Sequence, residues 1–478
     1  MLESVCALLL GTLYGLLVGI IPAAGATTGL VTVFAFLHLF TDPYLAVIFC
    51  MAVVAASTTG DSYTAILLGI PGANSAAATV VDGFPLAQQG KSTYALSAAI
   101  TTSTLNGLLW GSLVFFFLPY YVTLITYFGI PELWAFTVLA FACVVFISSK
   151  NALRSLIALS LGLFMGAIGT DPNTASQRFT GGWFYLEDGL QLIAIVAGLF
   201  AVPEMIAGLK RGSTTPYPEG NGQTKEGVLA VWENKWLALR GGLIGAFVGL
   251  LPALGGAVAD WIAYGQSVAT TKNPVVPFGK GNIRGVIGPE GANNAQKATS
   301  MLPTVLFGIP GASFAAVLMS IFAYLDFELG SIDLMYDEKF FSSLTFGFIC
   351  ASIIVAVICL CFNSTISKIA RVPYKYYFPL LLAFVTWASV QYTGGWEDYF
   401  ILFVASILGL ACKKFGFSRP ALLIGFILSE RIENMTIQLV SLYDISSLFA
   451  RPLFLTLIVS IVGVLSWGLF KKSQLDYV

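Results

Sequence analysis

The chain has 478 residues, of which 57% are hydrophobic and 10% are charged, and its formal net charge is −1. Soluble domains carry about 25% charged residues, so this composition excludes an ordinary water-soluble protein, and the near-zero charge offers no basic surface for nucleic acid. Long apolar runs recur along the whole chain. With roughly 20 residues needed per crossing, they predict an all-α polytopic membrane protein with about 11–12 transmembrane helices.

The first half of the chain, residues 1–209, is predicted to be one membrane repeat. An apolar run over 2–21 leads to the word Pro-Ala-Ala-Gly at 22–25, and a later run leads to Gly-Ile-Pro-Gly at 69–72. Proline lacks a backbone amide hydrogen and glycine is conformationally loose, so neither continues a helix well. Each word therefore predicts a broken membrane helix or a re-entrant helical hairpin.

Residues 210–236 are predicted to be a polar linker between two halves. The stretch is rich in Pro, Gly, Ser and Thr, and Lys210, Arg211 and Lys225 lie within it. Basic residues next to membrane segments favour the cytoplasmic side. We therefore expect the linker to be cytoplasmic.

The second half, residues 237–478, is predicted to be a second copy of the first. Residues 245–255 match residues 15–25 at six of eleven positions, an offset of 230, and Gly-Ile-Pro-Gly returns at 308–311, an offset of 239. Two separate motifs at nearly one offset indicate an internal duplication. Duplicated halves with broken helices are typical of secondary transporters built from inverted repeats.

The broken segments are the candidate substrate site. A helix N-terminus presents unpaired amide groups and a partial positive charge, which suits an anion. For one break, a kink needed for packing is the better explanation, but two matched pairs favour a binding site. The predicted substrate-binding residues are small or polar residues at the breaks and an adjacent asparagine pair: Gly25, Thr27, Thr28, Gly72, Asn74, Ser75, Gly255, Gly256, Asn293, Asn294, Gly311 and Ser313.

Acidic residues in apolar segments are costly and are therefore candidates for function. Asp61 precedes an apolar run, and Asp260 lies in an apolar segment with no other charge nearby. Together with Asn293, whose amide offers an acceptor and donors, they are the predicted ion-coupling residues, which coordinate Na⁺ or carry a proton. A structural role in a salt bridge or at the membrane interface is an equally open explanation for either acid.

The sequence predicts no enzyme. The segment 90–92 imitates the end of a nucleotide-binding loop, but proline occupies position 85, where that loop requires glycine. His38 is the only histidine, which disfavours a histidine-based catalytic set or zinc site. We predict no catalytic residues, no resident metal and no cofactor other than a bound Na⁺ or a transported proton.

Several words of the sequence together resemble the large membrane subunit of the tripartite tricarboxylate transporters. They lie in order over essentially the whole chain, at residues 65–72, 82–91, 198–204, 278–281, 289–295, 308–311, 433–434 and 451–452. The resemblance implies an elevator-like secondary carrier of the bacterial or archaeal inner membrane that imports small carboxylates with an ion gradient. It also implies two partners, a small four-span membrane subunit and an extracytoplasmic solute-binding protein.

Departures from the family's words leave alternatives open. The segments 22–25 and 252–255 read Pro-Ala-x-Gly where the family has Pro-Gly-x-Gly, and acids stand at Asp61 and Asp260. The added acids fit either proton coupling or a zwitterionic, amino-acid-like substrate. The predicted function is an ion-coupled carboxylate permease, and the alternatives are a carrier of a zwitterion and a membrane scaffold or channel-like subunit that transports nothing by itself.

Overall fold

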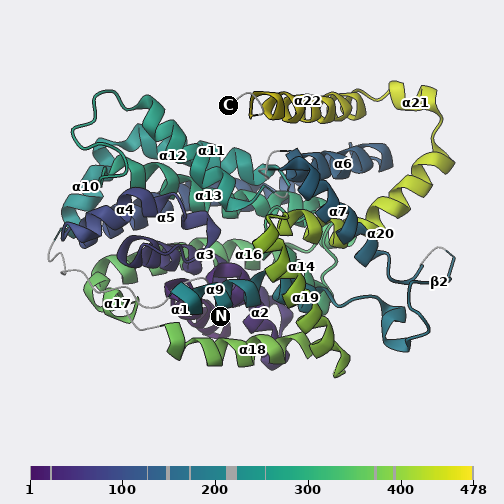
Figure 1. Cartoon of the computed structure of the whole chain (residues 1–478), viewed down its shortest axis with the longest axis horizontal. Coiled ribbons are helices and arrows are strands. Elements are labelled where there is room, and N and C mark those ends of the chain that lie inside the picture. The colour runs from purple at the N-terminus through teal and green to yellow at the C-terminus, as the bar shows by residue number, and fades with distance from the viewer. Residues whose placement is uncertain are drawn as a thin grey trace.

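The computed structural model describes residues 2–21, 24–125, 127–146, 151–171, 174–211, 223–252, 254–370, 374–390 and 395–475. Within these residues the chain is helical almost throughout (Figure 1). The first half contains α1 (Leu2–Ile20), α2 (Gly25–Phe34), η1 (Leu37–Leu39), α3 (Pro43–Leu68), η2 (Asn74–Ala76), α4 (Thr79–Gln88), α5 (Ser92–Ile125), α6 (Ile130–Phe146), α7 (Ala152–Gly166), η3 (Phe184–Asp188), α8 (Leu192–Val196), η4 (Ala197–Ala201) and α9 (Val202–Arg211). A short antiparallel hairpin pairs β1 (Gly169–Thr170) with β2 (Gln177–Arg178).

The second half continues with the same predominance of helix. It contains α10 (Thr224–Glu233), α11 (Lys235–Leu250), α12 (Gly255–Thr270), α13 (Arg284–Phe307), α14 (Ser313–Tyr324), α15 (Ile332–Met335), α16 (Glu338–Cys361), α17 (Asn363–Ala370), η5 (Tyr374–Tyr376), α18 (Phe378–Val390), α19 (Glu397–Phe415), α20 (Arg419–Leu442), α21 (Ile445–Phe449) and α22 (Pro452–Leu475). The C-terminal α22 lies along the edge of the molecule opposite α18, whereas the N-terminus lies near α1 and α2 (Figure 1).

Five segments of the described chain are long and apolar enough to cross a membrane. They are Leu2–Ile20, Pro43–Leu68, Ser92–Phe117, Leu192–Leu209 and Glu338–Cys361. Six further apolar helices have 10 to 17 residues. This pattern is that of an all-α membrane protein, as the composition predicts. The total of about 11–12 crossings stays a prediction.

The helix pairs α1–α3 and α11–α13 pack in the same way. A Cβ added at Gly15 of α1 would lie 2.7 Å from the carbonyl oxygen of Val53, and one at Gly245 of α11 would lie 2.2 Å from that of Ala292. Small residues allow two membrane helices to touch along their backbones. Position 15 corresponds to 245 at the offset of 230, and 53 corresponds to 292 at the offset of 239.

Both long helices end at the predicted Gly-Ile-Pro-Gly words. Gly69 caps α3 with φ +64°, and Gly308 caps α13 with φ +57°. Glycine adopts this left-handed backbone at little cost, which makes it the usual residue after a helix C-terminus. The proline of each word follows two residues later, so neither helix continues through it.

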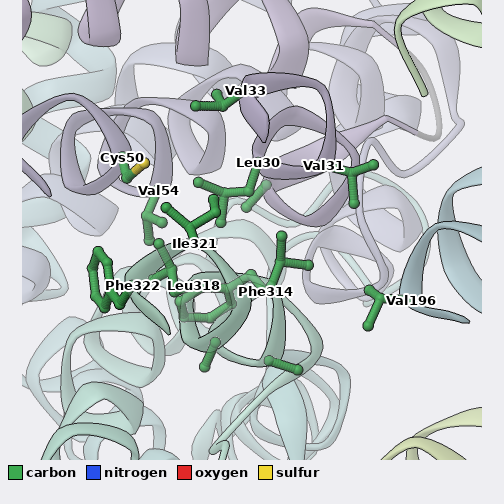
Figure 2. Packing of buried hydrophobic residues seen from close by; sticks show 14 of the residues in the cluster. Leu30, Val31, Val33, Cys50, Val54, Val196, Phe314, Leu318, Ile321 and Phe322 are labelled. Atoms are coloured by element: carbon green, nitrogen blue, oxygen red, sulfur yellow. The ribbon is translucent and has the colours of Figure 1, made fainter. Parts of the chain in front are cut away.

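The halves interlock around these two broken helices. α5 of the first half packs along α13, and α16 of the second half packs along α3. α2 also meets α14, and Leu30, Val54 and Leu318 of α2, α3 and α14 gather in one buried cluster (Figure 2). Residues of both ranges, 1–209 and 237–478, therefore contribute to one core.

The predicted linker at 210–236 contains a helix that composition does not reveal. α10 lies within it, while residues 212–222 are outside the described part of the chain. Gly227 rests on α5, where an added Cβ would lie 2.4 Å from the carbonyl oxygen of Tyr94. This contact, with Ala230 and Val231 also buried, explains how a polar segment folds against the membrane helices.

At the periphery, α20 packs closely on α7. A Cβ at Gly162 would lie 2.0 Å from the carbonyl oxygen of Leu422, and one at Gly425 would lie 2.4 Å from that of Leu159. Arg154, in the first turn of α7, donates to the carbonyl of Phe415 at 2.9 Å. The start of α7 is therefore tied to the turn between α19 and α20.

Candidate functional site

A cavity of about 560 Å³ lies where the breaks of both halves meet the turn between α19 and α20. Eight of the predicted substrate-binding residues line it: Gly25, Thr27, Thr28, Gly72, Ser75, Gly255, Gly256 and Ser313. They come from four segments that are far apart in the sequence. The fold thus collects the predicted breaks around one space.

Contacts between the halves hold these breaks together. The Thr27 and Ser313 hydroxyl oxygens are 3.1 Å apart, within hydrogen-bond distance. A Cβ at Gly256 would lie 2.5 Å from the Cβ of Ser75. Side chains from the two halves therefore touch at the cavity wall.

Helix N-termini, which carry a partial positive charge, lie at the wall of the cavity. α2, α12 and α14 begin at its wall, and none of the three has a side chain that caps its first amides. α7 and α20 also begin there, but Asn151 and Ser418 cap them by accepting from backbone amides. Uncapped N-termini leave backbone donors for an anion.

A cluster of charged side chains forms another part of the wall. Glu204 accepts from Lys413 at 2.9 Å and from Arg419 at 2.7 Å. The Arg419 guanidinium also lies 5.4 Å from the centre of the Phe200 ring and donates to the carbonyl of Leu199. These contacts fix the start of α20 next to η4 and α9.

Lys297 of α13 is one of the residues that line the cavity, and its ammonium nitrogen is itself buried. The whole residue is 3% exposed, and it is the one fully buried cation among the residues whose exposure the structure describes. The nearest acid is Asp61 of α3, with 3.8 Å between Nζ and Oδ2. That distance is too long for a hydrogen bond, and neither group has a hydrogen-bond partner among the described residues.

Two further buried acids lie around η2 and the start of α4. Glu290 of α13 accepts from Thr79 at 2.9 Å and from Ser62 at 3.0 Å. Asp260 of α12 accepts from the amide of Ala78 at 2.7 Å through Oδ2. Its Oδ1 has no partner in the described part of the chain.

The remaining predicted residues do not line the cavity. Asp61 lies behind Gly72, where an added Cβ would be 2.7 Å from Oδ1. The backbone of Gly311 packs on Ser300, and Asn294 lies against Gly107 of α5. Asp260 and Asn293 are buried away from the wall, and Asn74 begins η2 with a side chain outside the described part.

Sequence reasoning missed the charged residues of the site. Lys297 and Glu290 are ionisable groups in an otherwise small and apolar stretch, and the rule that selected Asp61 and Asp260 would also have selected them. No comparable reason in the sequence selects Arg154 and Arg419. Each is a basic residue at the start of an apolar helix, where such residues are common. Only the folded chain brings them to the cavity.

Comparisons with known proteins find one matching family and two relatives of this chain. A family model described as the tripartite tricarboxylate transporter TctA family matches residues 5–424. The "Uncharacterized 52.8 kDa protein in TAR-I ttuC' 3'region" of Agrobacterium vitis is 28% identical over 435 residues, which are 89% of this chain and 84% of that protein. The "Uncharacterized protein in TAR-II ttuC' 3'region" of the same organism is 27% identical over 190 residues, 40% of this chain and 78% of that protein.

No solved structure matches the chain. The family match spans both halves and includes all the helix breaks and every lining residue of the cavity, the last of which is Ile424. It identifies a component of a membrane transport system. The chain belongs to the tripartite tricarboxylate transporter TctA family.

Proposed function

We propose that the chain is the permease of an ion-coupled secondary transporter that imports small carboxylates across the inner membrane. The observation that carries this proposal is the cavity at which α2, α12 and α14 begin without side-chain caps. Backbone amides at a helix N-terminus and the helix dipole both favour a negative ligand group. The hydroxyls of Thr27, Thr28, Ser75 and Ser313 supply further donors.

The charges of the lining support a substrate with more than one carboxylate. The described lining residues include four cations, Arg154, Lys297, Lys413 and Arg419, and one acid, Glu204. A zwitterion would bring an ammonium group into this positive surface and be repelled. A dicarboxylate or tricarboxylate fits the surface better than an amino acid does.

Ion coupling is assigned to the acids behind the cavity. Asp61 and Asp260 are fully buried, and each has a carboxylate oxygen without a partner among the described residues. Asn293, one helical turn from Lys297, likewise has an unpaired amide oxygen. Buried oxygens of this kind are suited to Na⁺ or to a proton.

We also infer that 1–209 and 237–478 are inverted repeats that move in an elevator-like cycle, joined by a cytoplasmic linker. The matched glycine contacts of α1–α3 and α11–α13 and the matched caps at Gly69 and Gly308 support a duplication. Transport is proposed to require a small four-span membrane subunit and an extracytoplasmic solute-binding protein, as the family description implies a tripartite system.

The test is uptake into proteoliposomes that contain the full chain and the two partner proteins. Radiolabelled citrate, succinate and glutamate are the probes, and the imposed gradient is Na⁺ or protons. We expect uptake of citrate or succinate that depends on one gradient and exceeds uptake of glutamate. No gradient-dependent uptake of any probe by the complete system would refute the proposal.

A further inference from the structure

Lys297 and Asp61 form a buried ion pair in which neither charged group has a hydrogen-bond partner among the described residues. Lys297 and Asp61 are both buried, with side chains 4% and 0% exposed, yet 3.8 Å separates their nearest charged atoms. An ammonium group has three hydrogen-bond donors, and none of those on Lys297 has a partner among the described residues. Desolvated charges are costly unless hydrogen bonds accompany the pairing.

The two residues approach this contact from different sides. Lys297 lines the cavity, whereas Asp61 lies behind the backbone of Gly72 and does not reach the wall. The Lys297 Nζ atom is itself buried, so a carboxylate in the cavity reaches the ammonium group when the Lys297 side chain turns from Asp61 toward the cavity. A charge-assisted hydrogen bond of about 2.7–2.9 Å would be stronger than the existing pair at its longer distance.

We propose that a substrate carboxylate and Asp61 compete for Lys297, and that this competition couples the substrate to a cation. The inference rests on the proposed function of the cavity. When the substrate takes Lys297, Asp61 is left as a buried carboxylate without compensation, and it then favours a monovalent cation, either Na⁺ or a proton. By reciprocity, a cation at Asp61 releases Lys297 for the substrate.

The surrounding charges agree with this direction. Glu290 of α13 acts electrostatically on both members of the pair and is held by the hydroxyls of Ser62 and Thr79. Asp260 of α12 is the next buried acid and accepts from a backbone amide. When ionised, Glu290 adds negative potential at the pair, so losing Lys297 to a substrate makes a cation near Asp61 more favourable still.

The equivalent position in the other half provides a matched control. Gly311 packs on Ser300 as Gly72 packs on Asp61, and both partners stand eleven residues before their glycine. The Ser300 hydroxyl donates to the carbonyl of Lys297, within its own helix. The second break therefore has the same backbone contact without an acid.

The experiment is equilibrium binding of radiolabelled citrate and succinate to the purified full chain, with and without Na⁺ and at several pH values. In the wild type we expect Na⁺ or low pH to tighten binding by a factor between about 5 and 150, the usual range of coupling between two sites. The arm that responds identifies the cation. Asp61→Asn should bind tightly without the cation, whereas Ser300→Ala should behave as the wild type does.

Lys297→Gln alone leaves Asp61 buried and unpaired, so it can fail to fold. The double variant Asp61→Asn/Lys297→Gln removes both charges together and should fold, yet it should lose at least about tenfold in affinity. Each of three results would overturn the proposed competition. They are weaker binding by Asp61→Asn, cation-independent binding by the wild type, and full affinity in the double variant. A wild-type chain that binds neither probe would instead count against the proposed function itself.

Discussion

Two helix breaks meet at the cavity, one after α3 and one after α13, and they differ in chemistry more than in backbone. Gly69 and Gly308 have the same left-handed conformation, and Gly72 and Gly311 both press on the helix that precedes them. The residue under the first glycine is Asp61, however, and the residue under the second is Ser300.

Asp61 and Lys297, the charged residues that face each other between the halves, do not occupy equivalent positions in the two halves. At the offset of 239, Asp61 corresponds to Ser300, and Lys297 corresponds to Thr58. Each half thus contributes one charged residue at a position where the other half has a hydroxyl. A duplicated backbone can supply a symmetric frame for anion binding while one side of it specialises in ion coupling.

The largest expected effect is a loss of fold stability, and it concerns the close glycine contacts between helices that both halves share. Gly15→Leu and Gly245→Leu each place a side chain against the backbone of the neighbouring helix, and both should destabilise the fold by about 3 kcal/mol or more, at the upper end of overpacking effects. Size-exclusion chromatography after mild heating measures the loss. Gly265→Leu is the control, because no atom lies within 4 Å of a Cβ there.

Equal damage in the two halves would support equivalent packing of α1–α3 and α11–α13. If Gly245→Leu unfolds the chain while Gly15→Leu is harmless, the two pairs are not equivalent in the way their contacts suggest.

Glycine and proline also explain why much of the helical frame could be predicted from the sequence. Gly and Pro constrain the local backbone directly, so the words at 69–72 and 308–311 predicted where α3 and α13 end.

The charged part of the site could not be predicted in the same way. Whether Lys297 meets Asp61 depends on how α13 crosses α3, and the position of Arg154 depends on the distant turn after α19. Such contacts arise from packing between segments that local patterns do not relate. For the same reason α10 was missed, because the contact that buries Gly227 lies on α5.

An exchange of the two residues under the breaks sharpens the comparison. Asp61→Ser/Ser300→Asp keeps the composition but moves the acid from behind Gly72 on α3 to the position behind Gly311 on α13, three residues after Lys297. We expect cation-dependent uptake to fall by about tenfold or more, a change of about 1.4 kcal/mol in coupling, because the acid no longer faces Lys297 from α3. Uptake at varied Na⁺ and pH measures it, and unchanged cation dependence would show that either break can carry the acid.

A smaller effect is expected at the peripheral wall. Glu204→Gln removes the negative charge that Lys413 and Arg419 share, which makes the cavity more positive. The KM for citrate or succinate should fall by roughly two- to fivefold, the scale of a partly exposed ion pair. Glu430→Gln, at an exposed position of the same helix that Arg419 begins, is the control. A raised KM in Glu204→Gln alone would mean that Glu204 itself assists substrate binding.

The most direct test of the account is a reversible bridge between the two breaks. Thr27 and Ser313 belong to different halves, and their hydroxyl oxygens are 3.1 Å apart at the cavity. In Thr27→Cys/Ser313→Cys, oxidation should form a disulfide and abolish carboxylate uptake, and a reductant should restore it, while each single variant stays active. Failure of the bridge to form, or full uptake by the bridged chain, would contradict a transport site built where the breaks of the two halves meet.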